Sequence, residues 1–237
     1  MIHCSKNRET SQDRQHDVLP LDRQLTSQLF AIASSHCESR GGCHGPDHLE
    51  RVHGLVLCIG KRMGARLEIL SPAAILHDIG RKHESEQKGL LCHAAIGAEL
   101  ARTILTDLNF SKQDREEIIH CIATHRYRGT NIPLTTEAKI LYDADKLDSI
   151  GATGIGRAFL FAGQIGARLH NTKEDIKGSK PYTEEDTAYR EFQVKLRKIR
   201  KKMLTQVGQE MAAERHAFME LYFERLNQES GLFDSIL

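Results

Sequence analysis

The sequence contains no tryptophan, and phenylalanine and tyrosine together bring the aromatic share to only 5%. So few rings argue against a surface on which single-stranded nucleic acid stacks its bases. The formal net charge of +1 lacks the basic excess of a nucleic-acid or membrane-binding domain. No apolar run is long enough to span a bilayer. We therefore expect a cytoplasmic protein that acts on small molecules, with no nucleic-acid or membrane partner.

Sequence signals for export and for zinc knuckles are also missing. None of the six cysteines occurs in a Cys-x-x-Cys spacing, so we interpret them as reduced thiols of a cytosolic protein. The first 19 residues carry acidic side chains and no hydrophobic segment, which is unlike a signal peptide. We predict that residues 1–19 form a disordered tail.

Helical periodicity is what the rest of the sequence does contain. Apolar residues recur three and four positions apart, and no alternating strand pattern or internal repeat is present. The predicted fold class is therefore all-α. Helices are expected at about 21–38, 48–63, 70–79, 92–108, 112–126, 135–150, 151–166 and 184–229, the last with a bend near Gly208. We predict a helical domain over 20–165, a loop or lid over 166–183, and a C-terminal helical extension over 184–237.

The pair His77-Asp78 is the most informative feature of the sequence. A His-Asp pair alone is weak support for a site, and residues 16–17 form a second pair in a polar stretch. The pair at 77–78 instead ends the apolar run 73–76, which is typical of a buried helix. Ionisable side chains against such a segment have to be paired or bound to a metal.

Two further polar residues lie on the core-facing side of expected helices. His48 begins an apolar-periodic stretch, and Asp145 lies between the apolar residues Leu141 and Leu147. The set that we predict to bind metal is His48, His77, Asp78 and Asp145. These mixed nitrogen and oxygen ligands suit one divalent transition metal (manganese, cobalt, nickel, iron or zinc) better than magnesium.

Cationic residues cluster beside these motifs. An anionic substrate needs such groups, so the clustering is the strongest indication in the sequence of a phosphate substrate. Each cation by itself is also consistent with a solvated surface charge or with a nearby acid, and for Lys146 the competing partners are Asp143 and Asp148. The predicted substrate-binding residues are Arg51, Arg81, Lys82, Arg126 and Lys146.

Blocks of sequence at 44–52, 76–81, 93–98, 123–126, 143–151 and 192–229 carry a family resemblance. Their content and order resemble the HD superfamily of metal-dependent phosphohydrolases. The likeness is greatest to the stand-alone branch, which includes bacterial nucleotide pyrophosphohydrolases, and it covers about residues 44–229. One departure is Gly45-Pro46, where members of that branch commonly carry aromatic residues.

The resemblance implies a single HD-type helical domain with the C-terminal helices packed on it. Of the acidic residues at 143–148, only Asp145 matches the metal ligand of the family. The implied catalytic residues are Asp78, His93 and His125, and the implied activity is hydrolysis of a phosphate bond by metal-activated water.

The roles of His93 and His125 stay open at this point. Similar positions bind a second metal in binuclear members, whereas in the branch resembled most we expect one metal, with these residues facing phosphate or water. Packing alone is a third interpretation. The general acid for the leaving group is also open among His93, His125 and Glu84, as is the formation of a homo-oligomer.

Three functions are compatible with the sequence. We favour a nucleotide hydrolase, in particular a nucleoside triphosphate pyrophosphohydrolase. The alternatives are a binuclear phosphodiesterase or dinucleoside-polyphosphate hydrolase, and a nucleotide-sensing module without turnover. A cyclic-dinucleotide enzyme is disfavoured because no Gly-Tyr-Pro block follows His125, and an alarmone hydrolase because Ile79-Gly80-Arg81 follows the His-Asp pair in place of an acidic run.

Overall fold

The computed structural model describes residues 21–36, 45–87, 91–127, 131–171, 176 and 178–231. Within these residues there is no strand, which confirms the all-α prediction, and no helix is long and apolar enough to cross a bilayer. The tail predicted over 1–19 lies outside them. The α-helices are α1 (Arg23–Ser35), α2 (Pro46–Met63), α3 (Leu67–Leu76), α4 (Arg81–Glu86), α5 (His93–Asp107), α6 (Lys112–Thr124), α7 (Thr136–Asp148), α8 (Gly151–Gln164), α10 (Ala188–Glu191), α11 (Arg197–Ile199) and α12 (Gln206–Gly231).

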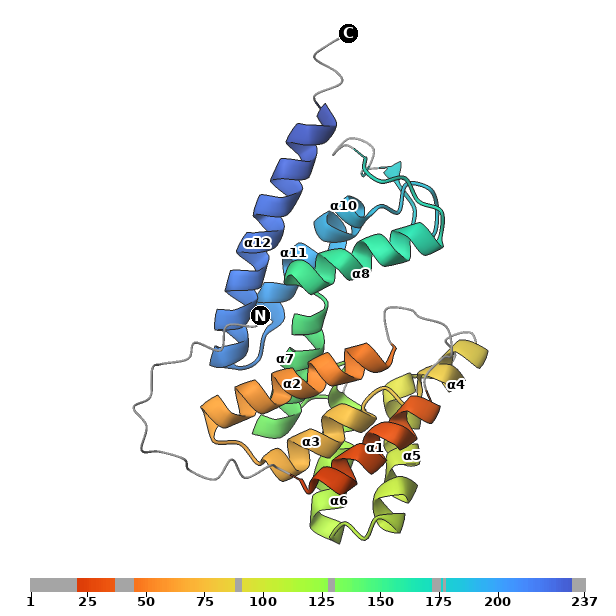
Figure 1. The fold of residues 1–237 in the computed structure, drawn as a ribbon, viewed down its shortest axis with the longest axis vertical. Helices are drawn as coiled ribbons and strands as arrows, with labels where there is room; N and C mark the ends of the chain where they lie inside the picture. The colour runs from red at the N-terminus through yellow and green to blue at the C-terminus, as the bar shows by residue number, and fades with distance from the viewer. Residues whose placement is uncertain are drawn as a thin grey trace.

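Helix α7 joins an N-terminal group of helices to a C-terminal group (Figure 1). Helices α2, α3 and α6 pack on it from the first group, and α8 and α12 pack on it from the second. The apolar stripe of α7, which includes Leu141, Ala144 and Leu147, is fully buried between them. Polar residues on α7 are therefore held in the interior, where both groups of helices meet.

Helix α2 begins at Pro46, only two residues before His48. Proline suits the first helical position because its φ is already helical and it has no N–H to leave unsatisfied. The acidic Asp47 in the first turn favours the same start, and Gly64 ends the helix with a left-handed φ of 63°. Gly45-Pro46 thus acts as a helix start that presents His48 from the first turn of α2.

Helix α3 ends at Leu76, so His77 and Asp78 lie in the turn before α4. The sequence pattern predicts a helix as far as residue 79, and that boundary is wrong. The turn packs tightly on α5: a Cβ at Gly80 would lie 2.2 Å from the carbonyl oxygen of His93 and 2.7 Å from the amide nitrogen of Gly97. The close approach to α5 therefore explains why helix α3 ends just before His77 and Asp78.

The C-terminal segment is less regular than its periodicity predicts. Between α10 and α12 the chain passes through a π-helical turn (Phe192–Leu196), α11 and a 3-10 turn (Arg200–Lys202). The break lies at residues 203–205, ahead of Gly208, where the buried Asp143 of α7 accepts hydrogen bonds from the amides of Leu204 and Thr205, each at 2.8 Å. Gly208, inside α12, leaves room for that carboxylate, because a Cβ there would lie 2.2 Å from Asp143 Oδ2.

Candidate metal centre

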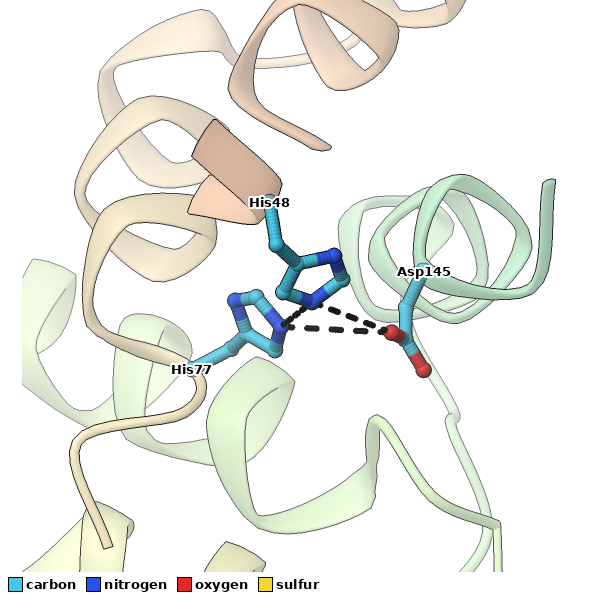
Figure 2. A group of neighbouring side chains, drawn as sticks. All are labelled: His48, His77 and Asp145. Atoms are coloured by element: carbon cyan, nitrogen blue, oxygen red, sulfur yellow. Dashed lines mark hydrogen bonds and ion pairs between the residues drawn. The ribbon is translucent and has the colours of Figure 1, made fainter. Parts of the chain in front are cut away.

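Side chains from α2, α7 and the turn after α3 converge on one point in the interior (Figure 2). The Nε2 atoms of His48 and His77 are 3.3 Å apart. Asp145 Oδ1 lies 3.6 Å from Nε2 of His48 and 4.0 Å from Nε2 of His77. Residues separated by almost 100 positions in the sequence therefore present their donor atoms to a common space.

Asp78 lies between this group and a second pair of histidines. Its Oδ2 is 3.4 Å from Nε2 of His48 and 3.5 Å from Nε2 of His77. Its Oδ1 is 3.3 Å from Nε2 of His93 and 3.6 Å from Nε2 of His125. The structure thus brings every predicted metal and catalytic residue together. The donors form two groups, each with its atoms within 4.8 Å of one another: His48, His77 and Asp145, and Asp78, His93 and His125.

Each of the four histidines places its other ring nitrogen, Nδ1, against a protein oxygen. An Nδ1–H that donates to oxygen fixes the ring tautomer and leaves the Nε2 lone pair for a cation, as in ligating histidines of metal sites. The donor set therefore fits a divalent metal. The four contacts join His48 to Asp148 Oδ2 (2.8 Å), His77 to the carbonyl of Ala74 (2.7 Å), His93 to Glu84 Oε2 (2.6 Å) and His125 to the carbonyl of Ile122 (2.7 Å).

Burial and hydrogen bonding together set the pKa values of His77, His125 and His48. Burial lowers the pKa of His77, and it holds the pKa of His125 well below the usual range with help from the neighbouring His77. Burial opposes protonation of His48 as well, but hydrogen bonds with Asp148 and Asp78 outweigh it and raise its pKa to about 9. A cation at Nε2 of His48 would take the place of that proton, so metal binding there releases a proton.

The two central carboxylates are ionised although they are buried. Burial by itself would raise the pKa of Asp78, but His77 and Arg81 hold it well below its usual range. Burial likewise opposes ionisation of Asp145, and Lys146 and His77 hold its pKa well below the usual range. The centre therefore offers negative charge together with the neutral imidazoles of His77 and His125, which is a combination that a divalent transition metal prefers.

Two of the predicted substrate-binding cations contact these carboxylates directly. The Arg81 guanidinium donates through Nε to Asp78 Oδ2. Lys146 Nζ lies 2.5 Å from Asp145 Oδ2 and 5.2 Å from the centre of the Tyr142 ring. The competing interpretation of Lys146 named Asp143 or Asp148 as its partner, whereas the structure pairs it with Asp145. Positive charge therefore lies at the edge of the candidate centre.

The other three predicted cations lie farther out. Arg126 NH1 contacts Glu84 Oε1 at 2.7 Å, on the outer side of the second group. Arg51 Nε contacts Asp148 Oδ1 at 2.6 Å, on the Nδ1 side of the His48 ring. Lys82 is exposed in the first turn of α4. A substrate role for these three stays a prediction.

Asp148 and Glu84 contact the site in ways that sequence reasoning missed. The sequence offers Asp148 only as a competing partner of Lys146, whereas in the structure it binds Arg51 and Arg157 and accepts the hydrogen bond of His48. The available signal was its spacing of three residues from Asp145, which puts both acids on neighbouring positions of one helix face. Glu84 was considered only as a general acid, and its contact with His93 Nδ1 makes it a positioning group.

Comparison with known proteins supports the same site. The HD domain model matches residues 47–150. The chain is 32% identical over 206 residues to the uncharacterized protein YpgQ of Bacillus subtilis, a match that covers 81% of this chain and 86% of YpgQ. The crystal structure of YpgQ in complex with ADP is similar with a TM-score of 0.66 at 29% identity, covering 86% of this chain and 97% of that one.

Two further similarities extend the comparison. The structure of a predicted HD superfamily hydrolase from an uncultured Thermotogales bacterium is similar with a TM-score of 0.63 at 25% identity, covering 86% of this chain and 92% of that one. A shorter match, 38% identical over 85 residues, joins 36% of this chain to 14% of Ribonuclease Y from Chloroflexus aurantiacus. The sequence, the fold and the converging histidines and aspartates lead to one conclusion: the chain belongs to the HD-domain superfamily and is a metal-dependent phosphohydrolase.

Proposed function

We propose that this phosphohydrolase acts on nucleotides, and specifically that it cleaves nucleoside triphosphates with release of pyrophosphate. The observation that carries the proposal is a buried cluster of histidines and aspartates with the cations Arg81 and Lys146 on its two central carboxylates. Such cations complement the charge of a polyphosphate. The complex of the similar protein YpgQ with ADP supports a nucleotide as ligand.

We assign His48, His77, Asp78 and Asp145 as the residues that would hold one divalent transition metal. When bound, such a metal lowers the pKa of a water molecule and withdraws charge from a phosphoryl oxygen. The outer partners of the histidine rings keep their Nε2 atoms directed inwards, so the protein contributes an arrangement that needs little adjustment on binding.

Arg81 and Lys146 are the proposed phosphate contacts. An ammonium group has three N–H donors, so Lys146 can hold Asp145 and a phosphate oxygen at once. Arg81 has five N–H donors and uses Nε on Asp78, so a terminal nitrogen can serve the substrate. Their proposed role is to orient the phosphate group and to stabilise the charge that develops during cleavage.

His93 and His125 face Oδ1 of Asp78, and we propose that they contact the substrate or water on that side. Glu84 Oε2 lies 2.6 Å from His93 Nδ1 and keeps the ring in place, while Arg126 NH1 holds the other oxygen of Glu84 at 2.7 Å. Through its Nε2, His93 can hold a proton beside the leaving group, the part of a general acid.

Two observations favour a second function, one from the structure and one from the comparisons. Asp78, His93 and His125 form a second group of donors that could hold another metal, and the short match to Ribonuclease Y lies in a protein named for phosphodiester cleavage. The alternative is a binuclear phosphodiesterase or dinucleoside-polyphosphate hydrolase.

One screen separates these functions. Purified protein is incubated with nucleoside triphosphates, phosphodiesters and dinucleoside polyphosphates in the presence of manganese, cobalt, nickel or magnesium, and both phosphate and pyrophosphate are measured. We expect pyrophosphate with a nucleoside monophosphate as the second product. Turnover of phosphodiesters alone would replace the proposal by the alternative, and absence of turnover with every substrate would leave a sensing module.

A further inference from the structure

Tyr127 lies just beyond the C-terminal end of α6, two residues after His125, and its backbone is strained. Its φ of 45° is left-handed, a conformation that is uncommon for any residue with a side chain and rarer for a bulky one. Its amide donates to the carbonyl oxygen of Thr124 at 2.9 Å. Glycine or asparagine is the usual choice for a left-handed residue, and strain of this kind is concentrated at ligand-binding positions. A tyrosine ring at this position therefore calls for a functional reason.

The ring of Tyr127 packs on a buried ring but is itself accessible. The ring centres of Tyr127 and Tyr142 lie 5.9 Å apart, with an angle of 74° between the ring planes. Tyr142 is only 5% exposed, whereas Tyr127 is 42% exposed. Tyr142 thus supports Tyr127 from below, and Tyr127 presents aromatic surface to the solvent.

Tyr142 connects Tyr127 to the metal centre. It lies on α7 one turn before Asp145 and Lys146, on the same side of the helix. Lys146 Nζ is 5.2 Å from the centre of the Tyr142 ring and 2.5 Å from Asp145 Oδ2. No more than one aromatic ring therefore separates Tyr127 from Lys146, the proposed phosphate contact.

This spacing suits a nucleotide whose α-phosphate lies at the metal centre. Hydrolysis that releases pyrophosphate takes place at the α-phosphorus, so that phosphate has to lie at the centre. Only one sugar ring separates the α-phosphate from the base. The base of such a substrate therefore reaches about as far from Lys146 as the Tyr127 ring lies. Every base has a π-face that can stack on an aromatic side chain.

We propose that Tyr127 stacks on the base of the substrate and makes the site select nucleoside triphosphates over polyphosphates that carry no base. The inference rests on the proposed function, because it takes Lys146 to be a phosphate contact. Purine bases have a larger π-face than pyrimidine bases, so the same contact favours purine nucleotides.

Three variants isolate the ring from the backbone. Tyr127→Asn removes the ring and keeps a residue that tolerates a left-handed φ, whereas Tyr127→Phe keeps the ring. Tyr182→Asn is the matched control, because Tyr182 has a φ of 61° and is 76% exposed. The Tyr182 ring contacts Phe161 of α8, which is not among the residues of the metal centre. Circular dichroism establishes that each variant is folded.

The probe is the α,β-methylene analogue of deoxyadenosine triphosphate, in which water cannot hydrolyse the link that we propose to be cleaved. It is titrated calorimetrically into full-length protein loaded with Mn²⁺, in parallel with inorganic tripolyphosphate. We expect Tyr127→Asn to bind the analogue about tenfold more weakly, the size expected for loss of one base–aromatic contact. Tyr127→Phe and Tyr182→Asn should bind it as the wild type does. Tripolyphosphate should bind all four proteins with equal affinity.

Equal affinity of the analogue for the wild type and Tyr127→Asn would overturn the proposal. An equal loss for the analogue and for tripolyphosphate would also overturn it, because Tyr127 would then act on the phosphate contacts and not on the base. The corresponding deoxycytidine analogue gives a second readout. It should bind the wild type more weakly than the deoxyadenosine analogue, and a difference that persists in Tyr127→Asn would contradict a role for the ring.

Turnover tests the proposed function separately from the stacking. Hydrolysis of nucleoside triphosphates together with an unchanged analogue affinity in Tyr127→Asn would support the function and overturn the stacking. Weakened analogue binding in Tyr127→Asn without turnover in the wild type would support base recognition and overturn the hydrolysis.

Discussion

His48 donates a hydrogen bond from Nδ1 to Asp148 Oδ2 across 2.8 Å, although the two residues lie 100 positions apart in the sequence. Asp148 is 1% exposed, and it also binds the guanidinium groups of Arg51 and Arg157. This carboxylate therefore determines the orientation and tautomer of a proposed metal ligand without facing the metal position itself.

Replacement of Asp148 by alanine should weaken metal binding. The His48 ring would lose the acceptor that orients it, and loss of such an outer partner typically costs about 10- to 100-fold in metal affinity. Calorimetric titration of Mn²⁺ into metal-depleted protein measures the effect, with circular dichroism to establish that the variant is folded. An unchanged affinity in folded Asp148→Ala would show that the contact does not support the metal.

Replacement of Lys146 by alanine should lower turnover by about a hundredfold and leave the metal content unchanged. The expected size is that for loss of one positioned donor to the developing charge. Steady-state kinetics and elemental analysis are measured together, with Lys112→Ala, an exposed lysine at the start of α6, as control. Normal kinetics would show that Lys146 is a surface charge with no role in turnover. Loss of metal would instead show that Lys146 acts only through Asp145, which it contacts.

Replacement of Gly80 by alanine should destabilise the fold and displace the His77-Asp78 turn. The added Cβ would meet the backbone of α5, which cannot move as a flexible side chain can, and overpacking of this kind costs roughly 1–3 kcal/mol. Gly54→Ala is the matched control, because nothing lies within 4 Å of its Cβ. That control should be neutral or slightly stabilising, since alanine favours a helix interior. Equal unfolding temperatures for the two variants would contradict the packing described for Gly80.

The thiol of Cys121 should be unreactive in the folded protein at pH 8. Burial raises its pKa to about 12 from an ordinary value of 9.0, and only the thiolate reacts readily with alkylating reagents. Because the folded state retains this proton more strongly, the contribution of Cys121 to stability is complete below pH 9 and is lost as the pH rises towards 12. Alkylation followed by peptide mapping should modify Cys121 in unfolded protein but not in folded protein. Modification at equal rates would refute the burial.

The convergence of His48, His77, Asp78 and Asp145 could be anticipated because each residue interrupts an apolar helical pattern, which needs a chemical reason. The start of α6 is likewise marked locally, because the hydroxyl of Ser111 accepts a hydrogen bond from the amide of Asp114. These are local signals, and a single sequence contains them.

The departures from the sequence prediction depend on contacts between distant segments. The turn at His77 follows from the approach of Gly80 to α5, and the break at residues 203–205 follows from the hydrogen bonds to Asp143. Asp148 likewise contacts His48 only because α2 and α7 pack against each other. Periodicity contains no information on such pairings, so helix boundaries and the partners of the histidines could not be derived from it.

Elemental analysis of an Asp78→Ala variant, together with its turnover, tests the central assignment most directly. Asp78 contributes an oxygen to both groups of donors, so its loss removes a ligand and a negative charge at once. We predict that Asp78→Ala loses both bound metal and hydrolytic activity, whereas Asp107→Ala, which removes an exposed carboxylate at the end of α5, keeps both. Full metal occupancy with normal turnover in Asp78→Ala would contradict the assignment of this centre.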